Sequence, residues 1–152
     1  PQGGGTMNVV IDSSTIIRAT MEQNRMAQRA LSLSIREHRI LMTDEMAKEL
    51  VATIIIVAEK KGQNPKPPLR VAATYLLRAK RVNSTTVYSW CCDPDDSMFI
   101  ECAIDGGAQV VVSNDGSLTK LQEYVTDEEG KRLIQTIEFL TPEEFVSKYS
   151  LT

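Results

Sequence analysis

The chain has 152 residues, with 20 acidic and 17 basic side chains and a formal net charge of -3. This length suits one compact domain that buries a core without disulfides. No stretch approaches the roughly 18 consecutive apolar residues of a membrane helix, and no secretory signal follows Met7, so we expect a cytoplasmic protein without membrane segments. We interpret residues 1–6 as the remnant of an expression tag and residues 7–152 as a single domain.

The three cysteines, Cys91, Cys92 and Cys102, form no CxxC pair, and adjacent cysteines are poorly placed to bridge. We therefore predict that they are small buried apolar residues, and we consider a structural zinc site much less favoured.

The first elements are a compact strand at residues 8–11 and a helix at residues 16–21, with Asp12 and three capping residues, 13–15, between them. Asp12 has two readings: it caps the helix, or it is a site residue at the end of a buried strand. A second helix is predicted at residues 24–38. His38 ends it and is interpreted as a surface or capping residue, not as a ligand.

A short strand at residues 40–42 precedes a long helix with Thr43 as its N-cap. Met46, Leu50, Ile54 and Val57 form the apolar stripe of this helix. Glu49 lies beside the stripe; it is either a solvated surface residue or, if other acids converge on it, a site residue.

Residues 63–68 read as a loop, residues 69–81 as a helix and residues 82–88 as a strand. Between residues 60 and 81 the chain has seven basic side chains and no acid. This basic stretch is either a solvated face, which is common, or a rim that contacts phosphates.

The most acidic segment, residues 93–118, contains six carboxylates and no Lys or Arg. A short helix is predicted at residues 97–104, with Asp95 or Asp96 as its N-cap, and two glycines that end it. The run at residues 108–112, which is apolar except for Gln109, is typical of a buried parallel strand. The strand ends at Ser113, so Asp115 is expected beyond its carboxyl end.

The remaining elements are a helix at residues 117–124, an acidic turn at residues 127–129, a strand at residues 136–140 and a terminal helix with Thr141 as its N-cap. The alternation of strands and helices predicts an α/β fold, a three-layer α/β/α sandwich with a central, mostly parallel sheet.

In such a sheet, ligands bind beyond the carboxyl ends of the strands. We expect four carboxylates to converge there: Asp12, Glu49, Asp96 and Asp115. Hard divalent cations prefer oxygen ligands, so this set points to Mg²⁺ or Mn²⁺ and not to zinc.

The same residues resemble the motifs of PIN-domain ribonucleases, close to the VapC-like toxins of prokaryotic toxin–antitoxin systems. VVIDSSTII is similar to the opening motif of the family, LMTDEMAKEL to its second, and DPDDSMFIECAIDGGAQVVVSND to its third and fourth. The closing IEFLTPEEF is similar to the family's final strand and helix start. The chain departs from the family at Ser13 and Ser14, where many members have Thr-Asn, at Ser113, where the family usually has Thr, and at Ser117, where it often has a further acid. The choice of Asp96 over Asp95 rests on this resemblance.

The resemblance implies a PIN-like fold and a Mg²⁺- or Mn²⁺-dependent endoribonuclease that hydrolyses single-stranded RNA. It places Asp12, Glu49, Asp96 and Asp115 as catalytic, metal-binding residues, and Ser14 and Ser113 as contacts to the substrate. Arg18 is a further candidate contact, because an acidic site needs cationic side chains to hold RNA. The resemblance also implies a homodimer and a cognate antitoxin, for which the Met and Leu side chains of residues 21–33 are the candidate surface unless they belong to the core.

The sequence is also compatible with two other classes of function. One is a different metal-dependent phosphohydrolase, which would prefer a mononucleotide to RNA. The other is a catalytically silent PIN-like module that binds proteins, whose acids would dock a basic peptide without any metal.

Overall fold

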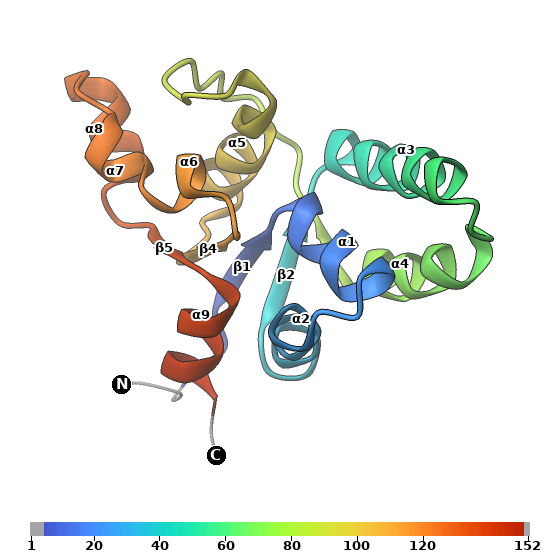
Figure 1. Ribbon diagram of the computed structural model, residues 1–152. Helices are drawn as coiled ribbons and strands as arrows, with labels where there is room; N and C mark the ends of the chain where they lie inside the picture. The colour runs from blue at the N-terminus through green and yellow to red at the C-terminus, as the bar shows by residue number, and fades with distance from the viewer. Residues whose placement is uncertain (1–4, 151–152) are drawn as a thin grey trace.

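The computed structural model describes residues 5–150, so four of the six residues interpreted as a tag remnant, and the last two of the predicted domain, lie outside the described residues. Five strands form one sheet in the order β3-β2-β1-β4-β5, and every pairing is parallel (Figure 1). The strands are β1 (Asn8–Ile11), β2 (Arg39–Met42), β3 (Lys80–Arg81), β4 (Val110–Val112) and β5 (Glu138–Leu140). The predicted parallel sheet is therefore confirmed.

Helices connect these strands throughout the described part of the chain. They are α1 (Ser13–Met21), α2 (Arg25–Glu37), α3 (Asp44–Lys61), α4 (Lys66–Arg78), the 3₁₀ turn η1 (Pro94–Asp96), α5 (Ser97–Gly106), α6 (Gly116–Thr119), α7 (Leu121–Tyr124), α8 (Glu128–Ile134) and α9 (Pro142–Tyr149). None of them is both long and apolar enough to cross a membrane.

The order of the strands places helices on both faces of the sheet. From β1 the chain adds β2 and β3 on one side, and then crosses to add β4 and β5 on the other. Because crossovers between parallel strands are right-handed, the two directions put their helices on opposite faces. The helices α1 and α2 pack together with α9 on one face, whereas α5 packs on β1, β2 and β4 and contacts α8 (Figure 1). The result is the predicted three-layer arrangement.

The core lies where the central strands meet these helices. Val9 and Val10 of β1 and all three valines of β4 are completely buried, as expected for parallel strands that are covered on both faces. The predicted stripe of α3 is also buried, except that Ala58 takes the place of Val57, which is only half-buried. Of the cysteines, Cys102 is buried, but Cys92 is exposed, contrary to the expectation.

The predicted strand at residues 82–88 is wrong. Only Lys80 and Arg81 pair with β2, and the chain beyond Val82 is extended without a neighbouring strand. Its backbone N–H groups are satisfied instead by carboxylates of α5. Thr85 and Thr86 donate to Asp105 at 2.7 and 2.8 Å, and Tyr88 donates to Glu101 at 2.8 Å. A segment rich in Val and Thr was thus stabilised by a helix and not by a sheet.

Several element boundaries also differ from the prediction. The helix α4 begins at Lys66, because prolines are compatible with a first helical turn, and it ends at Arg78. The helix α1 begins at Ser13, so that Asp12 is its N-cap. The acidic turn at residues 127–129 opens α8, which the sequence analysis missed, and the helix predicted at residues 117–124 is divided into α6 and α7.

His38 is the C-cap of α2, as predicted, but it is half-buried. Its Nδ1 accepts a hydrogen bond from the backbone of Met7 at 3.2 Å, and its ring lies 5.9 Å from that of Phe145. Burial lowers the pKa of His38, although Glu37 opposes this effect. These contacts support a structural role.

Candidate functional site

Asp12 lies at the carboxyl end of β1 and is buried, with 3% of its surface exposed. One carboxylate oxygen, Oδ1, accepts the backbone N–H of Thr15 at 3.0 Å and so caps α1. The other, Oδ2, accepts the hydroxyls of Ser14 at 2.9 Å and Ser113 at 2.5 Å. Asp12 therefore caps the helix and also faces the end of the neighbouring strand, so the two readings of its role are compatible.

Ser113 and Asp115 follow β4, which is the direct neighbour of β1. Ser113 is completely buried, and its Oγ accepts the backbone N–H of Asp115 at 2.9 Å while it donates to Asp12. Asp115 is exposed and caps α6 by accepting the N–H of Ser117 at 3.0 Å. The sheet order reverses between β1 and β4, and such a reversal is the usual place of a ligand site in an open α/β sheet.

Asp96 ends η1 directly before α5 and is 8% exposed. The hydroxyl of Ser117 donates to its Oδ2 at 2.9 Å. Burial raises the pKa of Asp96 to about 6; the Ser117 hydrogen bond opposes this rise, and the charges of Asp115, Asp93 and Asp12 add to it. Asp95, the alternative, is exposed. The structure thus places Asp96, and not Asp95, among the other acids.

Glu49 lies on α3 and is half-buried. Its Oε2 accepts a short hydrogen bond from the hydroxyl of Ser13, the residue next to Asp12, and its Oε1 accepts the hydroxyl of Thr53 at 3.2 Å. Serine hydroxyls and backbone N–H groups thus link Asp12, Asp115 and Asp96 through Ser113 and Ser117, whereas Glu49 is bonded to Ser13, which is joined to Asp12 only through the chain; we call this set the carboxylate–serine network. We define this network by Asp12, Ser13, Ser14, Glu49, Asp96, Ser113, Asp115 and Ser117.

The hydrogen bonds of Ser13 to Glu49 and of Ser117 to Asp96 are not predicted from the sequence. The available signal was the Ser-Ser-Thr run after Asp12, which was read as capping residues.

The network has the donor chemistry for a hard divalent cation. All its side chains offer oxygen, and within residues 5–150 none of its carboxylates forms an ion pair with Lys or Arg. In the same part of the chain, no three His, Cys, Asp or Glu side chains stand close enough together to be a ready ligand set. Oxygen donors are the ligands that Mg²⁺ and Mn²⁺ prefer. In this structure serine hydroxyls are bonded to carboxylate oxygens that a cation would use.

Of the three predicted substrate contacts, Ser14 and Ser113 belong to this network, and Ser113 is completely buried beside Asp12, where it does not face solvent. Ser14 and Arg18 are exposed and lie one turn apart on the same face of α1. The seven basic side chains of the basic stretch are exposed as well: Lys60, Lys61, Lys66, Arg70, Arg78, Lys80 and Arg81. Arg81 lies near the carboxyl end of β2, where its Nε is 3.4 Å from Asp44 Oδ1.

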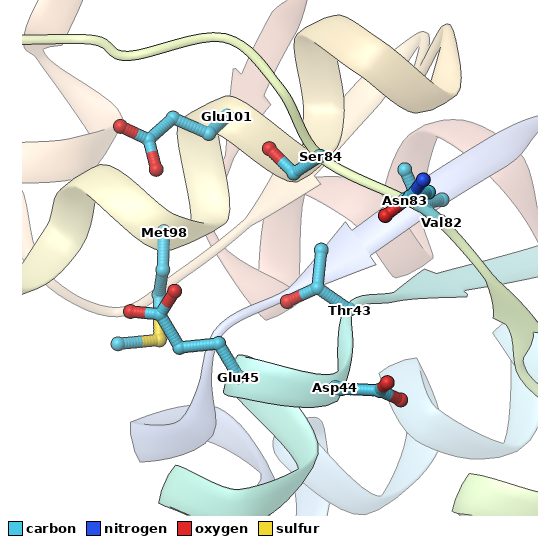
Figure 2. A pocket seen from close by; sticks show the side chains of 8 residues that line it. All are labelled: Thr43, Asp44, Glu45, Val82, Asn83, Ser84, Met98 and Glu101. Carbon is cyan, nitrogen blue, oxygen red and sulfur yellow. The ribbon is translucent and has the colours of Figure 1, made fainter.

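A cavity of about 170 Å³ lies beside the network, between the first turns of α3 and α5 (Figure 2). Its lining includes Thr43, Glu45, Asn83, Ser84, Met98 and Glu101. Glu45 lies one turn before Glu49 on α3, and Met98 lies two residues after Asp96. The cavity is therefore a neighbour of the four acids and does not contain them.

Comparisons with known proteins agree with this architecture. A crystal structure of VapBC2 from Rickettsia felis, bound to a DNA fragment from the promoter, is similar with a TM-score of 0.59 and 11% identity, over 89% of this chain and 98% of that chain. The crystal structure of PAE2754 from Pyrobaculum aerophilum has the same TM-score and identity over 100% of both chains. No curated protein matches the chain.

The family model of the PIN domain matches residues 8–117, which include Asp12, Glu49, Asp96 and Asp115. With a match over most of its length, the chain belongs to the PIN-domain family.

Proposed function

We propose that this PIN-domain protein is a Mg²⁺- or Mn²⁺-dependent endoribonuclease that hydrolyses phosphodiester bonds of single-stranded RNA. The observation that carries the proposal is the carboxylate–serine network at the ends of β1 and β4. Buried carboxylates without a basic partner are costly, and a divalent cation is the natural neutraliser of such a set. The match to the PIN family supports the same reading.

Separate sets of side chains would bind the cation and the RNA. Asp12, Glu49, Asp96 and Asp115 would hold the cation, which when bound activates water and stabilises charge on the phosphate. Asp12 is fixed in direction by its cap to Thr15, and Asp115 by its cap to Ser117. Caps of this kind keep both carboxylates in place before substrate arrives.

The exposed basic groups would hold the RNA. An acidic site repels a phosphate backbone, so affinity must come from cationic side chains around it. Arg18 and Ser14 face solvent on α1, and the basic stretch is exposed along α4 and β3. An open surface of this kind suits a single strand better than a paired helix.

We further propose that the protein is the toxin of a toxin–antitoxin system, acts in the cytoplasm, forms a homodimer and binds a cognate antitoxin. The similar fold of the VapBC2 structure supports this context. The candidate antitoxin surface in residues 21–33 needs correction, because Leu31 and Leu33 are buried in the core. Only Met21 and Met26 of its apolar side chains stay partly exposed.

The test is cleavage of a defined single-stranded RNA in the presence of Mg²⁺, Mn²⁺ or EDTA. Asp12→Asn keeps an oxygen for the cap to Thr15 but removes the charge, so it tests the site and not the fold. Asp96→Asn is compared with Asp95→Asn, its exposed neighbour, as a matched control. We expect metal-dependent cleavage that is lost with Asp12→Asn, Asp115→Asn and Asp96→Asn and kept with Asp95→Asn.

Equal cleavage by wild type and the Asp12 and Asp115 variants would refute the proposal. Binding of a basic peptide without cleavage or metal binding would favour the protein-binding module. A strong preference for a mononucleotide would favour a different phosphohydrolase.

A further inference from the structure

We propose that the cavity beside the carboxylate–serine network is a nucleobase pocket that selects guanine over uracil in the RNA next to the cleaved bond. The inference rests on the proposed function and adds its base preference. Glu45, which lines the cavity, lies one helical turn from Glu49 along α3, which corresponds to about 5.4 Å of helix axis. A base beside a phosphate bound at the four acids can therefore reach the cavity.

Carboxylate acceptors dominate the lining of the pocket. Glu45 is exposed, and no hydrogen bond to its side chain is recorded among the described residues. In Figure 2 its carboxylate lies next to Met98, while Asp44 is directed away from both. Glu101 lines the same cavity, and its Oε2 already accepts the N–H of Tyr88. Glu45 is therefore the acceptor with free capacity for a ligand.

The opposite wall is held in place before any ligand binds. Asp105 of α5 accepts the hydroxyl of Ser84 at 2.9 Å, together with the backbone N–H groups of Thr85 and Thr86. These bonds fix the extended segment that brings Asn83 and Ser84 to the cavity. A preformed wall lowers the entropic cost of binding a base.

The chemistry of this lining distinguishes the four bases. A carboxylate accepts two hydrogen bonds side by side, and the Watson–Crick edge of guanine presents two neighbouring N–H donors. Uracil presents one N–H between two carbonyl oxygens, which Glu45 and Glu101 would repel. Adenine and cytosine each offer one amino group and should fall between. The Met98 thioether supplies a polarizable surface for the ring.

Charge at the mouth of the pocket is partly balanced. Arg81 pairs with Asp44, so one of the three acids that line the cavity is neutralised. Successive strand residues point to opposite faces, so Arg81, and not Lys80, is the cationic side chain of β3 beside this cavity.

The test is equilibrium binding of fluorescent RNA tetramers in Ca²⁺, with four uridines as reference and one G, A or C replacing the second base. Glu45→Gln removes the charge and one acceptor of the pocket. Glu59→Gln, on an exposed residue of the same helix about four turns away, is the matched control. Circular dichroism shows whether each variant is folded.

We expect wild type and Glu59→Gln to bind the G tetramer about tenfold more tightly than the all-U tetramer, the discrimination of a good bidentate pair. The preference should disappear in Glu45→Gln. Equal affinities of wild type for all four tetramers, or an unchanged preference in Glu45→Gln, would overturn the pocket. RNA cleavage without base preference would refute the guanine pocket but not the nuclease function. G-selective binding without cleavage in Mg²⁺ or Mn²⁺ would refute the nuclease function and still support the guanine pocket.

Discussion

Ser113 is the hydroxyl on which the carboxylate–serine network depends most, and Ser113→Ala measures its contribution to stability. The substitution removes a donor to the charged Asp12 at 2.5 Å and an acceptor for the N–H of Asp115. A hydrogen bond to a charged group contributes about 1.5–3 kcal/mol, and a neutral one about 0.5–1.5 kcal/mol. Asp115 is exposed, so water can replace its lost acceptor, whereas Asp12 is buried and cannot be rehydrated as easily. We expect a loss of about 2–3 kcal/mol in the free energy of unfolding.

Ser34→Ala is the matched control for this experiment. Ser34 is also completely buried, but its hydroxyl donates only to the backbone oxygen of Ala30 at 2.8 Å, a neutral bond within α2. Its removal should cost less than about 1 kcal/mol. Urea unfolding in EDTA at neutral pH measures both variants without metal. If Ser113→Ala is no more destabilising than Ser34→Ala, the charged network contributes nothing special to the fold, and the argument is refuted.

Two further perturbations test separate parts of the fold. Gly107 ends α5 with φ of 68°, and nothing lies within 4 Å of an added Cβ, so Gly107→Ala should cost about 1–2 kcal/mol from backbone strain alone. The control in thermal unfolding is Gly116→Ala, which also has no close neighbours but has a negative φ. An equal Tm for the two variants would contradict this prediction. Burial raises the pKa of Asp105, but the hydrogen bonds from Thr86, Thr85 and Ser84 outweigh it and the net pKa is lowered. A carboxyl whose pKa is lowered by folding stabilises the fold at pH values above its unfolded pKa of about 3.9, and this stabilisation is lost as pH falls through its folded pKa. Asp105→Asn should therefore be less stable than wild type at pH 7, and the difference in free energy of unfolding should shrink below about pH 4. A difference in urea unfolding that does not change with pH would contradict the role given to Asp105.

The sequence predicted best the features that depend on local pattern. The buried β-branched runs of β1 and β4, the caps Thr43 and Thr141, and the end of α5 at two glycines are set by nearby residues. Thr141 even forms a complete capping box with Glu144. Such features follow from side-chain periodicity and from the unpaired N–H groups of helix starts, which do not require knowledge of the tertiary structure.

The features that sequence could not supply depend on partners that are distant along the chain. Residues 82–88 have the composition of a strand, but their N–H groups bind carboxylates of α5 that lie about twenty residues further on. In the site, the sequence indicates the four acids as candidates, but not the serine hydroxyls that bond to Asp12, Glu49 and Asp96. Ser113 meets Asp12 across 101 residues, and Ser117 meets Asp96 across 21. Sequence spacing carries no signal for such pairs.

The choice of serine in these positions has a physical reason. Lysine or arginine could also neutralise the buried acids, but a fixed ion pair would compete with a divalent cation for the same oxygens. A hydroxyl donates when a carboxylate needs a partner, and it can rotate and accept when that partner is taken. Ser117 shows the difference most clearly, because its hydroxyl donates to Asp96, whereas an acid at this position would repel that carboxylate. The network therefore satisfies its buried carboxylates without an ion pair in residues 5–150, and in the proposed nuclease a cation would displace rotatable hydroxyls and not Lys or Arg side chains.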